Sequence, residues 1–267
     1  MPKKQQPVFS VVVQTRQTPF LILKRCIQSI REQSLENVEI ILLDSNEKDS
    51  SYKDAISAAR GQWKGIFYLE IPEQGEYVKG KNTALNIFHG DYILFISAQD
   101  IMPPDRLERI YRVFQENRSY NAIYTNMAAQ EDNLLDVSDF SIQTGHFRYL
   151  GQLVFHRDCF EIIGKFDSDL IAHWDDEIWF RLKTMGLVHH FPAEEAAISI
   201  CPNCYHGYTP LDAAIGYRQI GVKYGSYFKK NKKARKKLYQ AIAEKYKKAG
   251  VVHRYIQFAT KAFFTHV

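Results

Sequence analysis

Phe9-Ser-Val-Val-Val-Gln-Thr15 is a β-branched, apolar run that ends in polar residues, and its pattern decides the class of fold. After Pro19 come apolar residues at roughly helical spacing, followed by a second apolar run, Val38–Asp44. Together these segments predict a strand, a helix and another strand. The pattern recurs, with strands expected at 66–71 and 92–96 and helices at 81–88 and 105–116, the last with Pro103 and Pro104 in its first turn.

Near-continuous apolar strands that alternate with helices are typical of a sheet covered on both faces. The sequence therefore predicts an α/β fold with a mainly parallel central sheet flanked by helices. In such sheets, ligands bind beyond the carboxyl ends of the strands. We expect functional residues directly after each strand, and these positions are polar: Gln14-Thr15-Arg16, Asp44-Ser45-Asn46 and Ser97-Ala98-Gln99-Asp100.

Composition narrows the class of protein. The chain has 267 residues, of which 45% are apolar and 24% charged, which excludes a disordered chain, a collagen repeat and a membrane bundle. The apolar run at 8–13 is too short for a signal-peptide core or a membrane span. We therefore expect a cytoplasmic protein whose four cysteines are reduced thiols.

Two common phosphate-binding motifs are absent from the sequence. No GxGxxG follows the first strand, and no GxxxxGK followed by Ser or Thr occurs in the chain. Their absence disfavours a dinucleotide-dependent dehydrogenase and a P-loop phosphotransferase.

Several short segments follow the opening strands in a characteristic order. They are 80–86 (GKNTALN), 90–96 (GDYILFI), 104–107 (PDRL), 155–158 (FHRD), 164–167 (GKFD) and 175–181 (DDEIWFR). With the opening segments FSVVVQT, LKRCIQSI and VEIILLD, this order and spacing resemble family 2 glycosyltransferases with the A-type nucleotide-sugar fold. The resemblance covers about residues 8–206.

The resemblance implies a site for a nucleotide-sugar donor. Positions that match Thr15 and Asp44 hold the base and ribose in the family, where a carboxylate can accept hydrogen bonds from uracil or from a sugar hydroxyl. Lys81, expected in the loop that enters the next helix, could screen a diphosphate with help from the helix N-terminus. Each of these residues could instead cap a helix or lie in a solvated loop.

The end of the fourth expected strand departs from the family pattern. The family usually has an Asp-x-Asp or Asp-Asp motif there, whose second carboxylate binds Mn²⁺ or Mg²⁺, whereas this chain has Ser97 and Gln99. Because hard divalent cations prefer charged oxygen ligands, we expect weakened metal binding. Three interpretations stay open: Asp100 becomes the metal ligand, the enzyme uses cations such as Lys81 in place of a metal, or the site has lost its activity. His206 is a further candidate for contact with the metal or the diphosphate.

Three consecutive acidic residues follow Trp174. By the resemblance, Asp175 matches the general base of an inverting transfer, which takes the proton of the acceptor hydroxyl as the nucleoside diphosphate leaves. Trp174 stands in place of the Glu that precedes this Asp in the family, and Asp176 is the fallback base. The alternative is that these acids only favour the positive end of a helix dipole.

The segment 145–155 lines the acceptor pocket in the family. His146, Arg148 and Gln152 are therefore the expected contacts with a sugar or phosphate, and Trp174 could stack on a sugar ring. Similar residues also occur on half-exposed strands for solubility alone. The CxxC pair at 201–204 is interpreted as two ordinary thiols, with a structural zinc site as the alternative.

The C-terminal part of the chain is strongly basic. Residues 223–261 contain thirteen Lys or Arg and one acid, a charge of +12 within a net charge of +5, which leaves −7 elsewhere. The run Lys229–Lys237 precedes a helix expected through Lys248, and apolar residues recur at helical spacing after Gly250. This pattern is typical of attachment to an anionic membrane surface, and the alternative is a solvated basic helix packed on the body. Nucleic-acid binding is disfavoured because no known reader module accompanies the charge.

These observations predict two domains and an activity. Residues 1–210 are expected to form the glycosyltransferase A-type domain, with a nucleotide-sugar half at 8–100 and an acceptor half at 101–210, and 211–267 a basic amphipathic helical extension. We predict an inverting hexosyltransferase that moves a sugar from a nucleotide donor, with a UDP-sugar favoured, to a saccharide or lipid-linked acceptor in surface polysaccharide synthesis. Its expected location is the cytoplasm or the inner face of the membrane. The alternative is a nucleotide-sugar-binding module, or partner subunit, without turnover.

Overall fold

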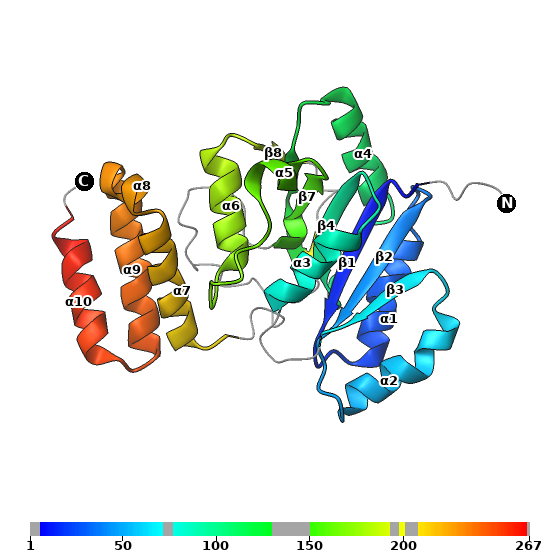
Figure 1. Cartoon of the computed structure of the whole chain (residues 1–267), viewed down its shortest axis with the longest axis horizontal. Helices are drawn as coiled ribbons and strands as arrows, with labels where there is room; N and C mark the ends of the chain where they lie inside the picture. The colour runs from blue at the N-terminus through cyan, green and yellow to red at the C-terminus, as the bar shows by residue number, and fades with distance from the viewer. Residues whose placement is uncertain (1–5, 72–76, 130–149, 193–197, 201–207, 266–267) are drawn as a thin grey trace. The chain divides into compact units, whose positions relative to one another are not determined.

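The computed structural model describes residues 6–71, 77–129, 150–192, 198–200 and 208–265 (Figure 1). The chain divides into two compact units, which are described separately. Unit 1 comprises Met1–Leu135, Phe147–Phe166 and Leu182–Tyr205, and unit 2 comprises Asp136–His146, Asp167–Arg181 and His206–Val267. This division groups residues 167–181 with the C-terminal helices, and the domain boundary expected at residue 210 stays a prediction.

Unit 1 is built on a seven-stranded sheet with the order β3-β2-β1-β4-β7-β5-β8. Its strands are β1 (Phe9–Thr15), β2 (Val38–Asp44), β3 (Ile66–Glu70), β4 (Tyr92–Ser97), β5 (Ala122–Thr125), β7 (Leu153–His156) and β8 (Val188–Phe191). β7 is antiparallel to β4 and β5, and the other pairs are parallel. A second, two-stranded parallel sheet joins β6 (Met127–Ala129) and β9 (Ile198–Ile200). The predicted mainly parallel α/β fold is confirmed.

Helices pack against the large sheet through the side chains that alternate along its strands. The helices of unit 1 are α1 (Phe20–Arg31), α2 (Ser51–Ala59), α3 (Tyr77–Ile87), α4 (Arg106–Glu116) and α5 (Cys159–Ile163), with short 3-10 turns η1 (Arg60–Gln62) and η2 (Leu150–Gln152). Val13 and Leu42 share one core cluster with the buried residues of α1 and α4. The next residue of β2, Leu43, points to the opposite face, where α3 contacts it near Gly80.

Two helices begin elsewhere than the sequence pattern predicts. α3 begins at Tyr77, one turn early, so that Lys81 lies inside the helix and not in the loop before it. A side chain at position 80 would crowd Ile71, because a Cβ there would lie only 3.0 Å from the Ile71 side chain. Glycine avoids this close contact. α4 begins at Arg106, and the two prolines precede it, since the Arg106 N–H bonds the Pro103 carbonyl at 3.1 Å and closes a turn there.

Unit 2 is helical. It contains α6 (Trp174–Thr184) up to Arg181, α7 (Pro210–Lys223), α8 (Gly225–Lys230), α9 (Lys232–Lys248) and α10 (Val252–Phe263). Figure 1 shows α7, α9 and α10 side by side. α9 begins at Lys232, inside the basic run Lys229–Lys237 and not after it. α7 starts with a capping box in which Thr209 and Asp212 bond each other's backbone. Among the described residues, no helix is long and apolar enough to cross a membrane.

Candidate functional site

The carboxyl ends of β1, β2 and β4 meet at one edge of the large sheet. Thr15 is in register with Asp44, and Gln14 with Ser97. The Ser45 N–H donates to the Thr15 carbonyl at 2.9 Å, which extends the ladder past the end of β2. The parallel topology therefore brings three of the predicted donor residues together in unit 1.

Asp44 is fully buried and accepts several hydrogen bonds. Its Oδ1 accepts from the backbone and side-chain nitrogens of Asn46 at 2.9 and 2.8 Å, and its Oδ2 accepts from the Tyr68 hydroxyl at 2.6 Å. Lys53 Nζ lies 3.4 Å from Oδ2 and 2.9 Å from Glu70. Burial, together with the hydrogen bond to Asp44, raises the pKa of Tyr68 to about 12. Asp44 thus orders the turn after β2, and its contact with a nucleotide stays a prediction.

Three buried polar atoms at the carboxyl ends of β1 and β2 are unused by the described part of the fold. Thr15 Oγ1, Ser45 Oγ and Gln14 Nε2 have no hydrogen-bond partner among the described residues. Thr15 is 0% exposed, so solvent does not reach its hydroxyl group in this arrangement. Native proteins rarely leave buried polar groups unpaired, and the exceptions call for a ligand, a water or a functional reason.

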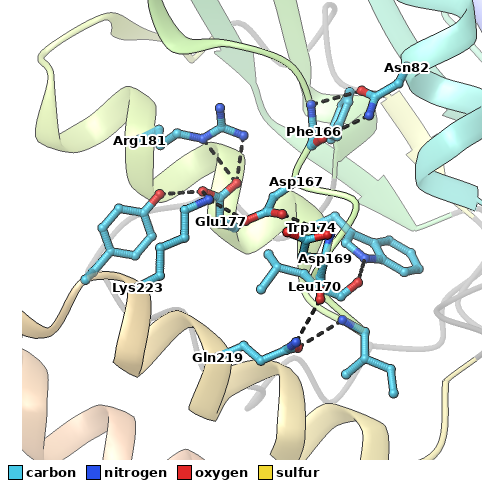
Figure 2. Close-up of polar contacts among 12 residues, drawn as sticks. Asn82, Phe166, Asp167, Asp169, Leu170, Trp174, Glu177, Arg181, Gln219 and Lys223 are labelled. Atoms are coloured by element: carbon cyan, nitrogen blue, oxygen red, sulfur yellow. Dashed lines mark hydrogen bonds and ion pairs between the residues drawn. The ribbon is translucent and has the colours of Figure 1, made fainter.

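α3 adds a positive charge to this edge. Lys81 Nζ donates to Gln14 Oε1 at the end of β1. The next residue, Asn82, bonds both the carbonyl and the N–H of Phe166, at 2.9 and 3.0 Å (Figure 2). This pair of hydrogen bonds joins α3 to the backbone at Phe166. Lys81 therefore reaches the expected edge from a helix and not from a loop.

The turn after β4 bonds to itself. Asp100 Oδ2 accepts from the Ser97 N–H at 2.7 Å, and Ser97 Oγ accepts from the Gln99 N–H at 3.3 Å. Asp100 is 1% exposed and lies near buried Cys26, whose pKa is raised by burial and then by the Asp100 charge. This geometry favours a turn-closing role for Asp100.

The described residues at this edge offer a divalent metal few charged ligands. Ser97 and Gln99 are neutral, and within the part of the chain that the structure describes, no three His, Cys, Asp or Glu side chains form a group able to hold a metal ion. The roles of Asp100 and His206 as metal ligands stay predictions, and His206 lies outside the described residues.

In unit 2, Glu177 is a fully buried hub between α6 and α7 (Figure 2). It accepts from Arg181 Nη2 at 2.7 Å, from Lys223 Nζ at 2.9 Å and from the Tyr224 hydroxyl. Lys223 also contacts Asp167 Oδ2 at 2.5 Å. Burial alone would raise the pKa of Asp167, but its hydrogen bonds with Lys223 and the Asp169 N–H lower it below its usual value. Burial and the bond to Glu177 raise the pKa of Tyr224.

Asp176 is also engaged in the packing of unit 2. Its Oδ2 lies 2.8 Å from His173 Nδ1 and accepts from the Tyr217 hydroxyl at 3.3 Å. The His173 ring stacks on Tyr217 with ring centroids 3.5 Å apart, and His173 holds a left-handed backbone with φ 65°. Asp176 and Glu177 therefore help to hold α6 to α7.

Asp175 and Trp174 begin α6. Asp175 is 8% exposed, and its Oδ1 accepts from the Asp176 N–H at 3.2 Å. Trp174 Nε1 donates to the Leu170 carbonyl at 2.7 Å (Figure 2). The catalytic role of Asp175 and the stacking role of Trp174 stay predictions.

Only some of the expected acceptor residues are among those that the structure describes. Gln152 is fully buried in unit 1, where its Nε2 donates to the Thr125 carbonyl at 2.7 Å, a geometry that favours a structural role. Its acceptor contact stays a prediction. His146, Arg148 and the CxxC pair at 201–204 lie outside the described residues.

The sequence pattern marked Gln14 and Ser45 as polar strand-end positions without giving them a role, and it did not mark Lys53 or Tyr68. Gln14 and Ser45 directly follow the predicted strands, so their position was the available signal. Lys53 and Tyr68 come from α2 and β3, and no local pattern indicates that they converge on Asp44.

Comparison with known proteins agrees with this architecture. A model of the family described as Glycosyl transferase family 2 matches residues 10–170, more than half of the chain. An uncharacterized glycosyltransferase of Methanocaldococcus jannaschii is 24% identical over 187 residues, which cover 66% of this chain and 64% of that protein. The chain thus spans less than two thirds of this relative's length.

Two solved structures share the fold. S. aureus TarS 1-349 in complex with UDP superposes with a TM-score of 0.61 and 13% identity over 94% of this chain and 89% of that one. The mannosyltransferase PcManGT from Pyrobaculum calidifontis, solved with GDP-Man and Mn²⁺, gives a TM-score of 0.64 and 17% identity over 93% of this chain and 74% of that one. With the A-type sheet, its polar carboxyl edge and the family match over residues 10–170, the chain belongs to glycosyl transferase family 2.

Proposed function

We propose that this chain is an inverting glycosyltransferase that binds a nucleotide sugar at the carboxyl ends of β1, β2 and β4. The donor is proposed to be a UDP-sugar carrying a hexose, and the acceptor a hydroxyl group of a saccharide or lipid-linked saccharide in surface polysaccharide synthesis. Membership of the family supports the reaction class. The fold shared with TarS, solved with UDP, and with PcManGT, solved with GDP-Man, supports this donor class, so both nucleotides enter the test.

The observation that carries the proposal is the set of unused polar atoms at the carboxyl ends of β1 and β2. Thr15 Oγ1, Ser45 Oγ and Gln14 Nε2 are donors that find no partner in the described structure. Each buried donor left unpaired costs about 1–3 kcal/mol, a cost that the carbonyl and hydroxyl oxygens of a nucleotide would remove. The edge is therefore prepared for a polar ligand, and the fold alone does not need these groups.

The chemistry follows from the charges. The Lys81 ammonium, held at the end of β1 by Gln14, would screen the donor diphosphate. Asp175 would take the proton from the acceptor hydroxyl group as the oxygen of that hydroxyl group bonds to the anomeric carbon of the donor sugar. The bond from that carbon to the phosphate oxygen breaks at the same time, and the nucleoside diphosphate leaves with the electron pair. Attack opposite the leaving group inverts the anomeric configuration, and no step is assigned to a metal.

The sharpest test replaces the unused hydroxyl group with a methyl group. Thr15→Val keeps the shape of the side chain and removes only Oγ1, so UDP affinity should fall about 3- to 10-fold, with thermal stability unchanged or raised. Isothermal titration calorimetry with UDP and with GDP, each with and without Mn²⁺, measures the affinity.

Thr125→Val is the matched control in the same unit. The Thr125 hydroxyl accepts from Arg106 Nη2 at 3.3 Å, so its loss should lower stability and leave UDP affinity unchanged. Wild-type protein that binds neither nucleotide under any condition, or Thr15→Val with full affinity, would contradict the proposed donor site.

A nucleotide-sugar-binding module without turnover is the second candidate. It is favoured by the neutral, self-bonded turn after β4, where Asp100 is turned inward. A donor hydrolysis assay separates the two functions: intact UDP binding with no turnover by the wild type indicates the module, and turnover indicates the enzyme.

A further inference from the structure

α10 carries more apolar surface than its packing uses. Phe258 and Ala262 are buried, and Phe258 belongs to the core cluster of unit 2. On another side of the same helix, Val252, Ile256 and Phe263 are exposed by 63%, 56% and 74%. Exposed apolar side chains that form a continuous patch indicate an interaction surface.

The three exposed side chains form a row. They are 4 and 7 residues apart, so they lie within about 40° of one another around the helix and span about 16 Å along it. Phe264, 65% exposed, extends the patch at the C-terminal end. We call Val252, Ile256, Phe263 and Phe264 the α10 row. In Figure 1, α10 is the red helix beside α9.

The segment of the chain that carries the α10 row is strongly basic. Residues 223–261, which include α8, α9 and most of α10, hold thirteen Lys or Arg and one acid. Two of these cations contact aromatic side chains of α10 outside the row: Lys261 Nζ is 5.0 Å from the Phe258 ring centroid, and Lys247 Nζ is 5.9 Å from that of Tyr255. Two copies of this face would bring like charges together, which disfavours self-association through it.

We infer that unit 2 docks on an anionic lipid bilayer, with the α10 row inserted among the lipid chains at the surface and the surrounding lysines against the headgroups. An amphipathic helix in this setting gains binding energy from its buried apolar area and from electrostatic attraction to anionic lipid. Each Lys or Arg near such a surface adds to the attraction, which falls off within a Debye length. This surface is independent of the donor site in unit 1.

The test uses the full chain and extruded vesicles in a flotation assay. Wild-type protein should float with vesicles of phosphatidylcholine mixed with phosphatidylglycerol and not with phosphatidylcholine alone, and added salt should weaken binding. Ile256→Ser/Phe263→Ser should weaken binding at least about tenfold, because two inserted side chains are lost. Lys232→Gln/Lys233→Gln should weaken it about fivefold for each charge removed.

The matched control is Ile162→Ser/Phe67→Ser, which makes the same two exchanges at side chains of unit 1 that are 49% and 50% exposed. It should bind vesicles as the wild type does. Thermal melting followed by circular dichroism checks that each of the double variants folds. Absence of wild-type binding, or equal binding by Ile256→Ser/Phe263→Ser, would overturn the inference. So would a wild-type dimer, seen by sedimentation velocity, that this variant abolishes. UDP titration of the same samples reports separately on the donor site.

Discussion

Asp44 in unit 1 and Glu177 in unit 2 are both fully buried carboxylates that gather several donors, yet their surroundings differ. Beside Asp44, the hydroxyl groups of Thr15 and Ser45 have no partner within the described structure. The donors around Glu177 come from Arg181, Lys223 and Tyr224 and join two helices. The difference teaches that a buried acid can serve packing alone, and the proposed donor site rests on polar groups in excess of what the described fold uses.

The largest effect is expected at Asp175, the proposed base. Asp175→Asn should lower kcat by about 10²–10⁴, because the amide cannot accept the acceptor proton, and UDP affinity should stay the same. Nucleoside diphosphate release from the donor measures the rate.

Asp176→Asn is the control for that loss. It removes a charged partner of His173 and Tyr217, so it should lower the melting temperature with little change in kcat. If Asp176→Asn removed turnover and Asp175→Asn did not, the assignment of the base would be wrong.

The next effect separates the two buried carboxylates directly. Glu177→Gln should lower the free energy of unfolding by about 2–3 kcal/mol, because Arg181 and Lys223 lose their counter-charge, and UDP affinity should not change. Asp44→Asn should lower both quantities, because its carboxylate holds Lys53 and orders the donor edge. Urea unfolding and calorimetry measure them. Equal loss of UDP affinity in the two variants would remove the distinction between the regions.

The smallest effect is a pH dependence in unit 2. The lowered pKa of Asp167 means that the unfolded chain takes up a proton at higher pH than the folded one. The stabilisation is therefore complete above the unfolded value of 3.8 and is lost as the pH falls through the lowered folded value. Asp167→Asn should make the decline of the urea midpoint below about pH 4 shallower than in the wild type. Identical slopes would show that the ion pair with Lys223 does not stabilise the fold.

Much of the donor edge could be predicted because strand periodicity is local. Apolar runs located β1, β2 and β4, and parallel strands end at a common edge, so Thr15, Asp44 and Ser97 were expected together. The start of α3 was missed because Gly80 weakens a helical pattern, and its place in the helix depends on the approach of Ile71.

The amino-acid sequence by itself determined the class of fold, the family and the order of the strand ends. The reason is that the alternation of strands with helices and the spacing of the motifs are local properties of the sequence. Only the tertiary structure decided which polar groups form hydrogen bonds within the described fold and which have no partner there. Tyr68 and Lys53 reach Asp44 from other elements, and Lys223 reaches Glu177 across 46 residues. Such partners are set by packing between distant segments, which no local pattern encodes.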